Sequence, residues 1–92
     1  MILNVTSAKY EGAYRIQLNF DNGESGLVDL KATIFKDNRK IFFPLREINY
    51  FKSFKIKFNT LTWDNEADFA PEFLLELLIK QREELIQEHH IS

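Results

Sequence analysis

Hydrophobic and polar residues alternate along several short stretches in the first two thirds of the chain. The clearest stretch is residues 14–20, where an aromatic or aliphatic side chain occupies every second position. Residues 2–8 follow the same pattern, with Leu3 and Val5 as apolar positions. Because successive side chains of a strand point to opposite faces, this alternation predicts strands with one buried and one solvated face.

The loop at residues 21–23 joins the clearest strand to the next one and fixes their register. A two-residue Asn-Gly loop would place Ile16 opposite Asp29 and turn a carboxylate toward the core. A three-residue loop, with Gly23 left-handed and a β-bulge, places Ile16 opposite Val28 instead. Because the second register keeps the apolar residues on one face, we predict the three-residue loop.

The middle of the chain has no sustained period. Residues 31–40 hold Ile34 and Phe35 among polar side chains, which predicts a short helical piece followed by a surface loop. Residues 42–45 are apolar enough to return to the core, and residues 46–51 are expected to form one or two helical turns.

A second hairpin is predicted where two short alternating stretches follow one another. The dipeptide at 59–60 occupies the turn, which sets Phe58 opposite Leu61 and Ile56 opposite Trp63. The threonine of this dipeptide is β-branched and disfavours positive φ, so a wider turn is the alternative. In the predicted register Phe58 and Ile56 face the core, and Trp63 is a core anchor beneath the C-terminal helix.

A long helix is predicted to begin at Pro71 and to continue to about Glu88, because no glycine or further proline interrupts it. Residues 73–79 are apolar on nearly every side, which predicts that this half is covered on more than one side. Apolar residues continue along the second half, where a second copy or a partner protein would cover them. The candidate interface residues are Leu78, Ile79, Leu85 and Ile86.

Together these elements predict an α+β fold. We expect a small, mostly antiparallel sheet of about five short strands arranged in hairpins, a short middle helix, and a long C-terminal helix across one face. The 92 residues fit a single domain over residues 1–92, with a core at residues 1–75 and a helical C-terminal extension at residues 76–92.

The composition argues against an enzyme. The chain has no cysteine, its two histidines are His89 and His90 near the C-terminus, and its three glycines do not form a phosphate-binding loop. We therefore expect a non-enzymatic protein with no cofactor. The chain also has no apolar signal segment at its N-terminus and no apolar run of about 20 residues, which favours a cytoplasmic protein without a membrane segment.

Charge is distributed unevenly along the chain. Residues 1–63 carry +4 and residues 64–92 carry −6, which sum to the net charge of −2. The basic residues concentrate in residues 31–57, among many phenylalanines, a combination that would suit single-stranded nucleic acid. The alternative is a solvated face over a phenylalanine core, which a pI near 5.6 favours. The candidate nucleic-acid contacts are Lys31, Lys36, Arg39, Lys40, Lys52, Lys55 and Lys57.

A cluster of acidic residues precedes the C-terminal helix: Asp64, Glu66, Asp68 and Glu72. Carboxylates at such spacing can bind a divalent cation or exchange protons with a substrate. The spacing lacks the glycine and closing glutamate of a calcium loop, so we favour a structural role with no metal. Asp68 is expected to support the turn or cap the helix, and Asp29 to accept backbone hydrogen bonds where the chain leaves the sheet.

Several of these motifs, taken together, resemble the small bacterial domain-of-unknown-function family 2442. The matching residues are Asn22-Gly23-Glu24, Asp29-Leu30, Trp63, Ala67-Asp68 and the helix start at Pro71. The resemblance spans residues 2–75. The sequence departs from the family pattern at two places. The family usually has glycine where Glu66 stands, so we expect a rearranged turn there. The helical tail at residues 76–92 runs past the usual end of the domain.

The resemblance implies a role but no chemistry. Relatives are often encoded beside another small protein, which implies a paired, antitoxin-like or regulatory function, and no catalytic residue is established for the family. We therefore expect an interaction module that forms a homodimer or binds a small cognate protein. Nucleic-acid binding through residues 31–57 is the alternative.

Overall fold

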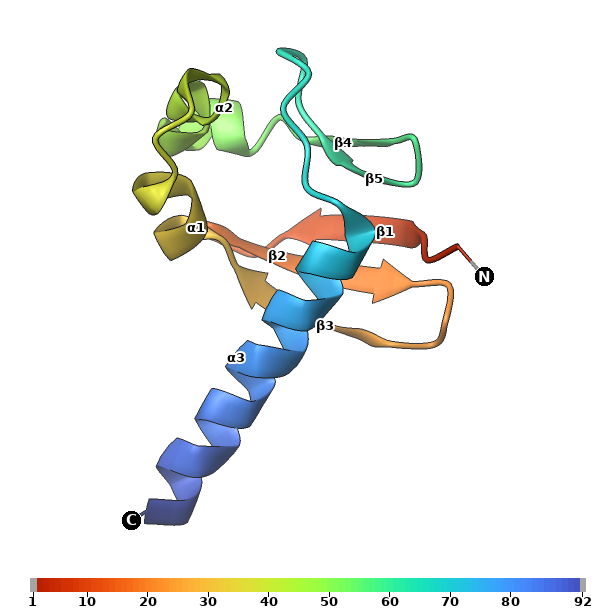
Figure 1. Cartoon of the computed structure of the whole chain (residues 1–92), viewed down its shortest axis with the longest axis vertical. Helices are drawn as coiled ribbons and strands as arrows, with labels where there is room; N and C mark the ends of the chain where they lie inside the picture. Colours follow the sequence, from red (N-terminus) through yellow and green to blue (C-terminus); the bar gives the residue numbers. More distant parts are fainter. Residues whose placement is uncertain (1, 92) are drawn as a thin grey trace.

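The computed structural model describes residues 2–91 and shows an α+β fold, as predicted (Figure 1). Five strands form two antiparallel sheets, one of three strands in the order β1-β2-β3 and one of two strands, β4-β5, rather than one sheet of five. The elements are β1 (Val5–Tyr10), β2 (Arg15–Phe20), β3 (Ser25–Asp29), α1 (Lys31–Lys36), the 3₁₀ helix η1 (Lys40–Arg46), α2 (Ile48–Phe51), β4 (Lys55–Lys57), β5 (Thr60–Thr62) and α3 (Pro71–Ile91).

The register of the β2–β3 hairpin is the predicted one. Ile16 pairs with Val28, and the Phe20 N–H donates to the Glu24 carbonyl at 2.9 Å. Gly23 has a φ of +87°, in the left-handed region that a side chain with a Cβ disfavours. The hydrophobic pattern therefore determines this register, and Gly23 makes the loop possible.

The first strand begins and ends later than predicted, at Val5–Tyr10 instead of residues 2–8. A register irregularity lies between Val5 and Ser7, which shifts the inward-facing positions from odd to even numbers. The inward-facing apolar residues are Val5 before the irregularity and Ala8 and Tyr10 after it, so a strict alternation does not describe this strand.

The turn of the β4–β5 hairpin lies one residue earlier than predicted, so every pairing partner shifts by two positions. Ile56 pairs with Leu61, and the two turn residues are Phe58 and Asn59, with φ of +53° and +69°. Phe58 is consequently 90% exposed at the tip of the hairpin rather than in the core. Thr60 avoids the left-handed turn by joining β5, where its hydroxyl donates to the Phe69 carbonyl.

Trp63 is an anchor of the core, with 3% of its surface exposed. Its indole N–H donates to the Phe51 carbonyl at 2.9 Å, and its ring packs against the rings of Phe51, Phe54 and Phe69. Trp63 thus connects α2 with the segment that leads into α3. Of the apolar residues predicted to return to the core nearby, Phe42 is buried and Phe43 is 43% exposed.

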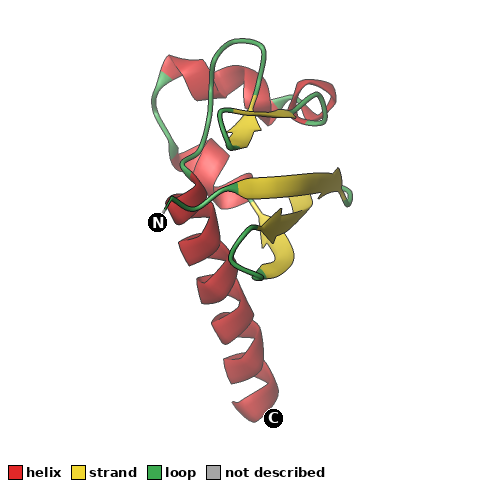
Figure 2. Ribbon diagram, turned by 90° about the vertical axis from the view of Figure 1, so that its right-hand side faces the viewer, coloured by secondary structure: helices red, strands yellow, loops and turns green. Residues whose placement is uncertain are grey.

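Helix α3 packs on the three-stranded sheet only along its first half. Figures 1 and 2 show it crossing the sheet and continuing past β3, so that its C-terminal end projects from the rest of the molecule. Leu74 and Leu78 are buried, whereas Phe73 is 39% exposed. On either side of the stripe that Leu74 and Leu78 form, three apolar residues are half-buried against the core: Leu75, Leu77 and Ile79. The expectation that residues 73–79 are covered on more than one side therefore holds for them.

Candidate functional site

An open groove of about 940 Å³ lies where α1, the edge strand β3 and the second half of α3 meet. Its apolar lining consists of Leu27 from β3, Ala32 and Phe35 from α1, and Leu78 and Leu85 from α3. Charged side chains border it, among them Arg15, Lys31, Lys36 and Glu84. A mostly apolar concavity with polar groups around it is typical of a binding site.

The strand wall of the groove is the open edge of the sheet. The Leu30 N–H donates to the Tyr14 carbonyl at 2.9 Å, so the even-numbered residues of this segment bond to β2. The backbone groups of Ser25, Leu27 and Asp29 consequently face away from β2, toward α3. Leu27 is 44% exposed, and its side chain forms part of the groove.

Gln81 on α3 occupies the place of a neighbouring strand at this edge. Its side-chain amide accepts from the Asp29 N–H at 2.9 Å and donates to the Asp29 carbonyl at 2.9 Å. Arg82 donates to the Ser25 carbonyl at 2.9 Å and forms an ion pair with Glu24 at 3.5 Å. Two adjacent helix residues therefore hold both ends of β3 and fix where α3 leaves the sheet.

The close approach of α3 to β3 depends on Gly26. A Cβ at this position would lie 3.2 Å from both terminal methyl carbons of Leu78. Leu78 is buried, so it has little room to move. Glycine thus sets the distance between the strand wall and the helix wall of the groove.

Asp29 forms the corner between the strand wall and the α1 wall. Its side chain accepts from the Lys31 N–H at 2.9 Å, which is the turn role predicted for it, at the first residue of α1. Asp29 therefore holds α3 through its backbone and starts α1 through its carboxylate.

The outer end of α1 is fixed by Arg46, which lies in η1. Its guanidinium donates to the Phe35 carbonyl at 3.2 Å and to the Asp37 carbonyl at 3.1 Å. The same group lies 4.5 Å from the ring centroid of Phe43 and 5.5 Å from that of Phe35. Tyr14 donates its hydroxyl to the Arg46 carbonyl, which ties this cluster to the sheet.

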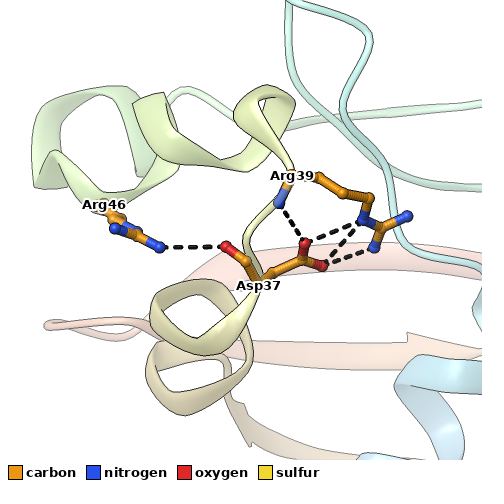
Figure 3. A network of polar contacts seen from close by, with 3 residues as sticks. All are labelled: Asp37, Arg39 and Arg46. Atoms are coloured by element: carbon orange, nitrogen blue, oxygen red, sulfur yellow. Dashed lines mark hydrogen bonds and ion pairs between the residues drawn. The ribbon is translucent and has the colours of Figure 1, made fainter.

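Asp37 and Arg39 complete the support behind α1 (Figure 3). Arg39 donates to the Asp37 carboxylate from its side chain, at distances from 2.6 to 3.2 Å, and from its backbone N–H at 3.0 Å. These hydrogen bonds lower the pKa of Asp37 from 3.8 to about 2. The Asp37 carboxylate is therefore ionised at neutral pH and holds the chain where α1 ends.

The seven candidate nucleic-acid contacts are spread over three elements and two loops. Lys31 and Lys36 lie on α1 beside the groove, whereas Arg39 is bound to Asp37 and Lys55 to Asp64 at 3.1 Å. Lys40 begins η1, Lys52 follows α2 with its ammonium 5.7 Å from the Tyr10 ring centroid, and Lys57 lies in β4. Of the phenylalanines in this segment, Phe42 and Phe51 are buried in the core, whereas Phe35 and Phe43 are each 43% exposed.

The acidic residues before α3 build a turn. Glu66 has a φ of +71°, and its N–H donates to the Trp63 carbonyl at 2.9 Å. Asp68 pairs through its backbone with Thr62, and its side chain is exposed. Within the described residues, no group of three or more potential metal-ligating side chains lies close enough to hold an ion.

Asn65 is the residue of this turn that the sequence interpretation missed. Its side chain accepts from the Ala67 N–H at 3.1 Å and donates to the Ile41 carbonyl at 2.8 Å. Its own N–H donates to the Tyr50 hydroxyl at 3.0 Å. The signal was available, because asparagine commonly forms turns through its side chain.

The four candidate interface residues differ in exposure. Leu78 is buried on Gly26, and Ile79 is half-buried. Leu85 and Ile86 are 58% and 60% exposed, and Leu85 lines the groove. The candidate interface thus continues from the core into the groove instead of forming a separate stripe.

The family assignment agrees with the hairpin, the turn and the helix start described above. The family model for a protein of unknown function (DUF2442) matches residues 5–80 of the 92 residues. The chain belongs to this DUF2442 family. The match ends five residues beyond the expected boundary at residue 75, before the exposed Leu85 and Ile86. No curated protein and no solved structure matches the chain.

No helix in the described part of this DUF2442 protein is long and apolar enough to cross a membrane.

Proposed function

We propose that this protein is a non-enzymatic interaction module that binds a protein partner in the groove between α1, β3 and α3. The observation that carries the proposal is the uncovered apolar lining of the groove. Leu27, Phe35 and Leu85 are 44%, 43% and 58% exposed, although they lie together in one concavity. Contiguous exposed apolar surface with a polar border marks interaction sites in soluble proteins.

The rigidity of the walls supports the same function. Gln81 and Arg82 hold the helix wall on the strand, and Arg46 holds the α1 wall. A preformed groove loses little conformational entropy when a partner binds, which favours affinity. The small cognate protein implied by the family resemblance and a second copy of this chain are the two partners that this proposal admits.

Site-specific photo-crosslinking tests the proposal. A benzophenone amino acid replaces Leu27 in the groove, and in a control chain it replaces Phe58, which is 90% exposed on the β4–β5 turn. Irradiation in the native host should give a discrete protein adduct from the groove position and not from the more exposed control. Equal adducts from both positions, or none from the groove, would contradict a groove-specific partner.

A further inference from the structure

The second half of α3 carries apolar surface that its own chain does not cover. Leu85 and Ile86 are adjacent, and about three fifths of each is exposed. Arg82 is the last residue of α3 with a hydrogen bond to the sheet among the described residues. At 1.5 Å per residue, the helix continues for roughly 13 Å beyond this point, to its end at Ile91.

The groove and this helix end carry opposite charges. Arg15, Lys31 and Lys36 border the groove, and within the described residues none of them has a carboxylate oxygen within 4.0 Å. Residues 83–92 contain three glutamates and no lysine or arginine. Although Asp29 and Glu84 also border the groove, three basic side chains there remain without an ion pair in the described part of the chain, and the exposed Leu85 and Ile86 lack a surface to pack on.

We infer that a second copy of this chain occupies the groove, with the acidic second half of its α3 lying against α1 and β3 of the first. The inference rests on the proposed function and names its partner. Leu85 and Ile86 of each copy cover the apolar lining of the other, and Glu83 and Glu84 face Lys31 and Lys36. Each α3 is both a wall of its own groove and the occupant of the partner's.

Self-complementarity is the reason for choosing a second copy over another protein. The uncovered groove and the uncovered helix belong to one chain, so a single contact made twice covers both. A contact that is repeated about a two-fold axis closes, and it gives a dimer rather than a filament. The α3 helix of one copy then lies beside the α3 helix of the other, and the two-fold axis makes the two helices antiparallel.

Reversing the charges on one side at a time tests the inference. The groove variant is Lys31→Glu with Lys36→Glu, and the helix variant is Glu83→Lys with Glu84→Lys. Each variant alone places like charges in contact, so its dimer should dissociate at least about tenfold more readily than the original. Mixed one to one, they place opposite charges at both contacts and should form a heterodimer about as stable as the original dimer.

Matched control variants change charge elsewhere on the surface. Lys40→Glu with Lys57→Glu has the charge of the groove variant, and Glu72→Lys with Glu76→Lys has that of the helix variant. Both controls should remain dimeric in sedimentation equilibrium, and circular dichroism should show all four variants folded.

Three results would overturn the inference. One is an original chain that sediments as a monomer at high micromolar concentration. Another is a pair of variants that each dimerise as well as the original, and the third is a mixture that fails to form the heterodimer. None of these results affects the proposed function if the crosslink from Leu27 joins a different protein.

Discussion

Gln81 and Asp29 are 52 positions apart, yet they pair through both hydrogen-bonding groups of the Gln81 amide and both backbone groups of Asp29. This pairing has the pattern of a neighbouring strand and closes one end of the β3 edge. It also determines where α3 turns from a core helix into a wall of the groove. The position of the groove therefore depends on this contact.

Gln81→Glu should weaken this attachment. The substituted carboxylate keeps an acceptor but loses the donor to the Asp29 carbonyl, and we expect a loss of about 1 kcal/mol in the free energy of unfolding. Hydrogen exchange at residues 83–86 should also become faster. Urea denaturation and exchange mass spectrometry measure both effects. Glu76→Gln, on the exposed side of α3, is the control, and equal stability of the two variants would contradict the role of Gln81.

Glu66→Gly should stabilise the protein. Glu66 has a φ of +71°, a conformation that costs a residue with a Cβ about 1–2 kcal/mol and that glycine adopts readily. We expect a gain of about 0.5–1 kcal/mol, because the greater freedom of glycine in the unfolded chain offsets part of the benefit. Asp68→Gly, two residues further along at an ordinary φ, should destabilise. If chemical denaturation shows that Glu66→Gly and Asp68→Gly both lose stability, the positive φ of Glu66 does not strain the folded protein.

Gly23→Val should destabilise by about 1–2 kcal/mol. Gly23 has a φ of +87°, and a Cβ there would meet no atom within 4 Å, so the cost comes from the backbone and not from a clash. Gly23→Asn should lose less, since asparagine tolerates the left-handed region. Equal losses in the two variants, measured by urea denaturation, would show that the conformation of the loop is not the cause.

The Asp37–Arg39 pair should make stability depend on pH at the acid end. Hydrogen bonds from Arg39 lower the pKa of Asp37 to about 2 in the folded protein, below the ordinary value of 3.8. The contribution of ionised Asp37 to the free energy of unfolding is therefore complete above about pH 4 and is lost as the pH falls through 2. The melting temperature of Asp37→Asn should lie below that of the original at pH 7, and the two should converge near pH 2.

Arg39→Gln provides the control for this pH dependence. In that background, Asp37→Asn should change the melting temperature little at any pH, because the hydrogen bonds that lower the pKa of Asp37 are gone. If the melting temperatures of the original and of Asp37→Asn still differ by the same amount at pH 2, ionisation of Asp37 is not the source of the stability difference.

Local pattern predicts the β2–β3 hairpin and the start of α3 because both depend on residues close in sequence. Gly23 is adjacent to the turn it permits, and Pro71 occupies the first position of its helix. The β4–β5 register is wrong in the prediction because the positive φ values fall on Phe58 and Asn59, and β-branched Thr60, which disfavours them, joins β5 instead.

The groove escapes sequence interpretation for a different reason. Its apolar residues come from three segments, represented by Leu27, Phe35 and Leu85, and no local period connects them. Their meeting depends on the hydrogen bonds of Gln81 and the close approach at Gly26. The exposed Leu85 and Ile86 were nevertheless predicted, since their apolar character in a solvated helix is visible in the sequence.

The central claim, that the groove is covered by protein in the cell, can be tested directly because the chain has no cysteine. Ala32→Cys places one thiol in the groove, and Asn22→Cys places one on the exposed β2–β3 loop. Alkylation by a membrane-permeant maleimide is timed in the native host and in dilute purified protein. We predict that the groove thiol reacts at least about tenfold more slowly in the cell while the loop thiol reacts equally in both. Equal rates in cell and purified protein at Ala32→Cys would contradict the claim.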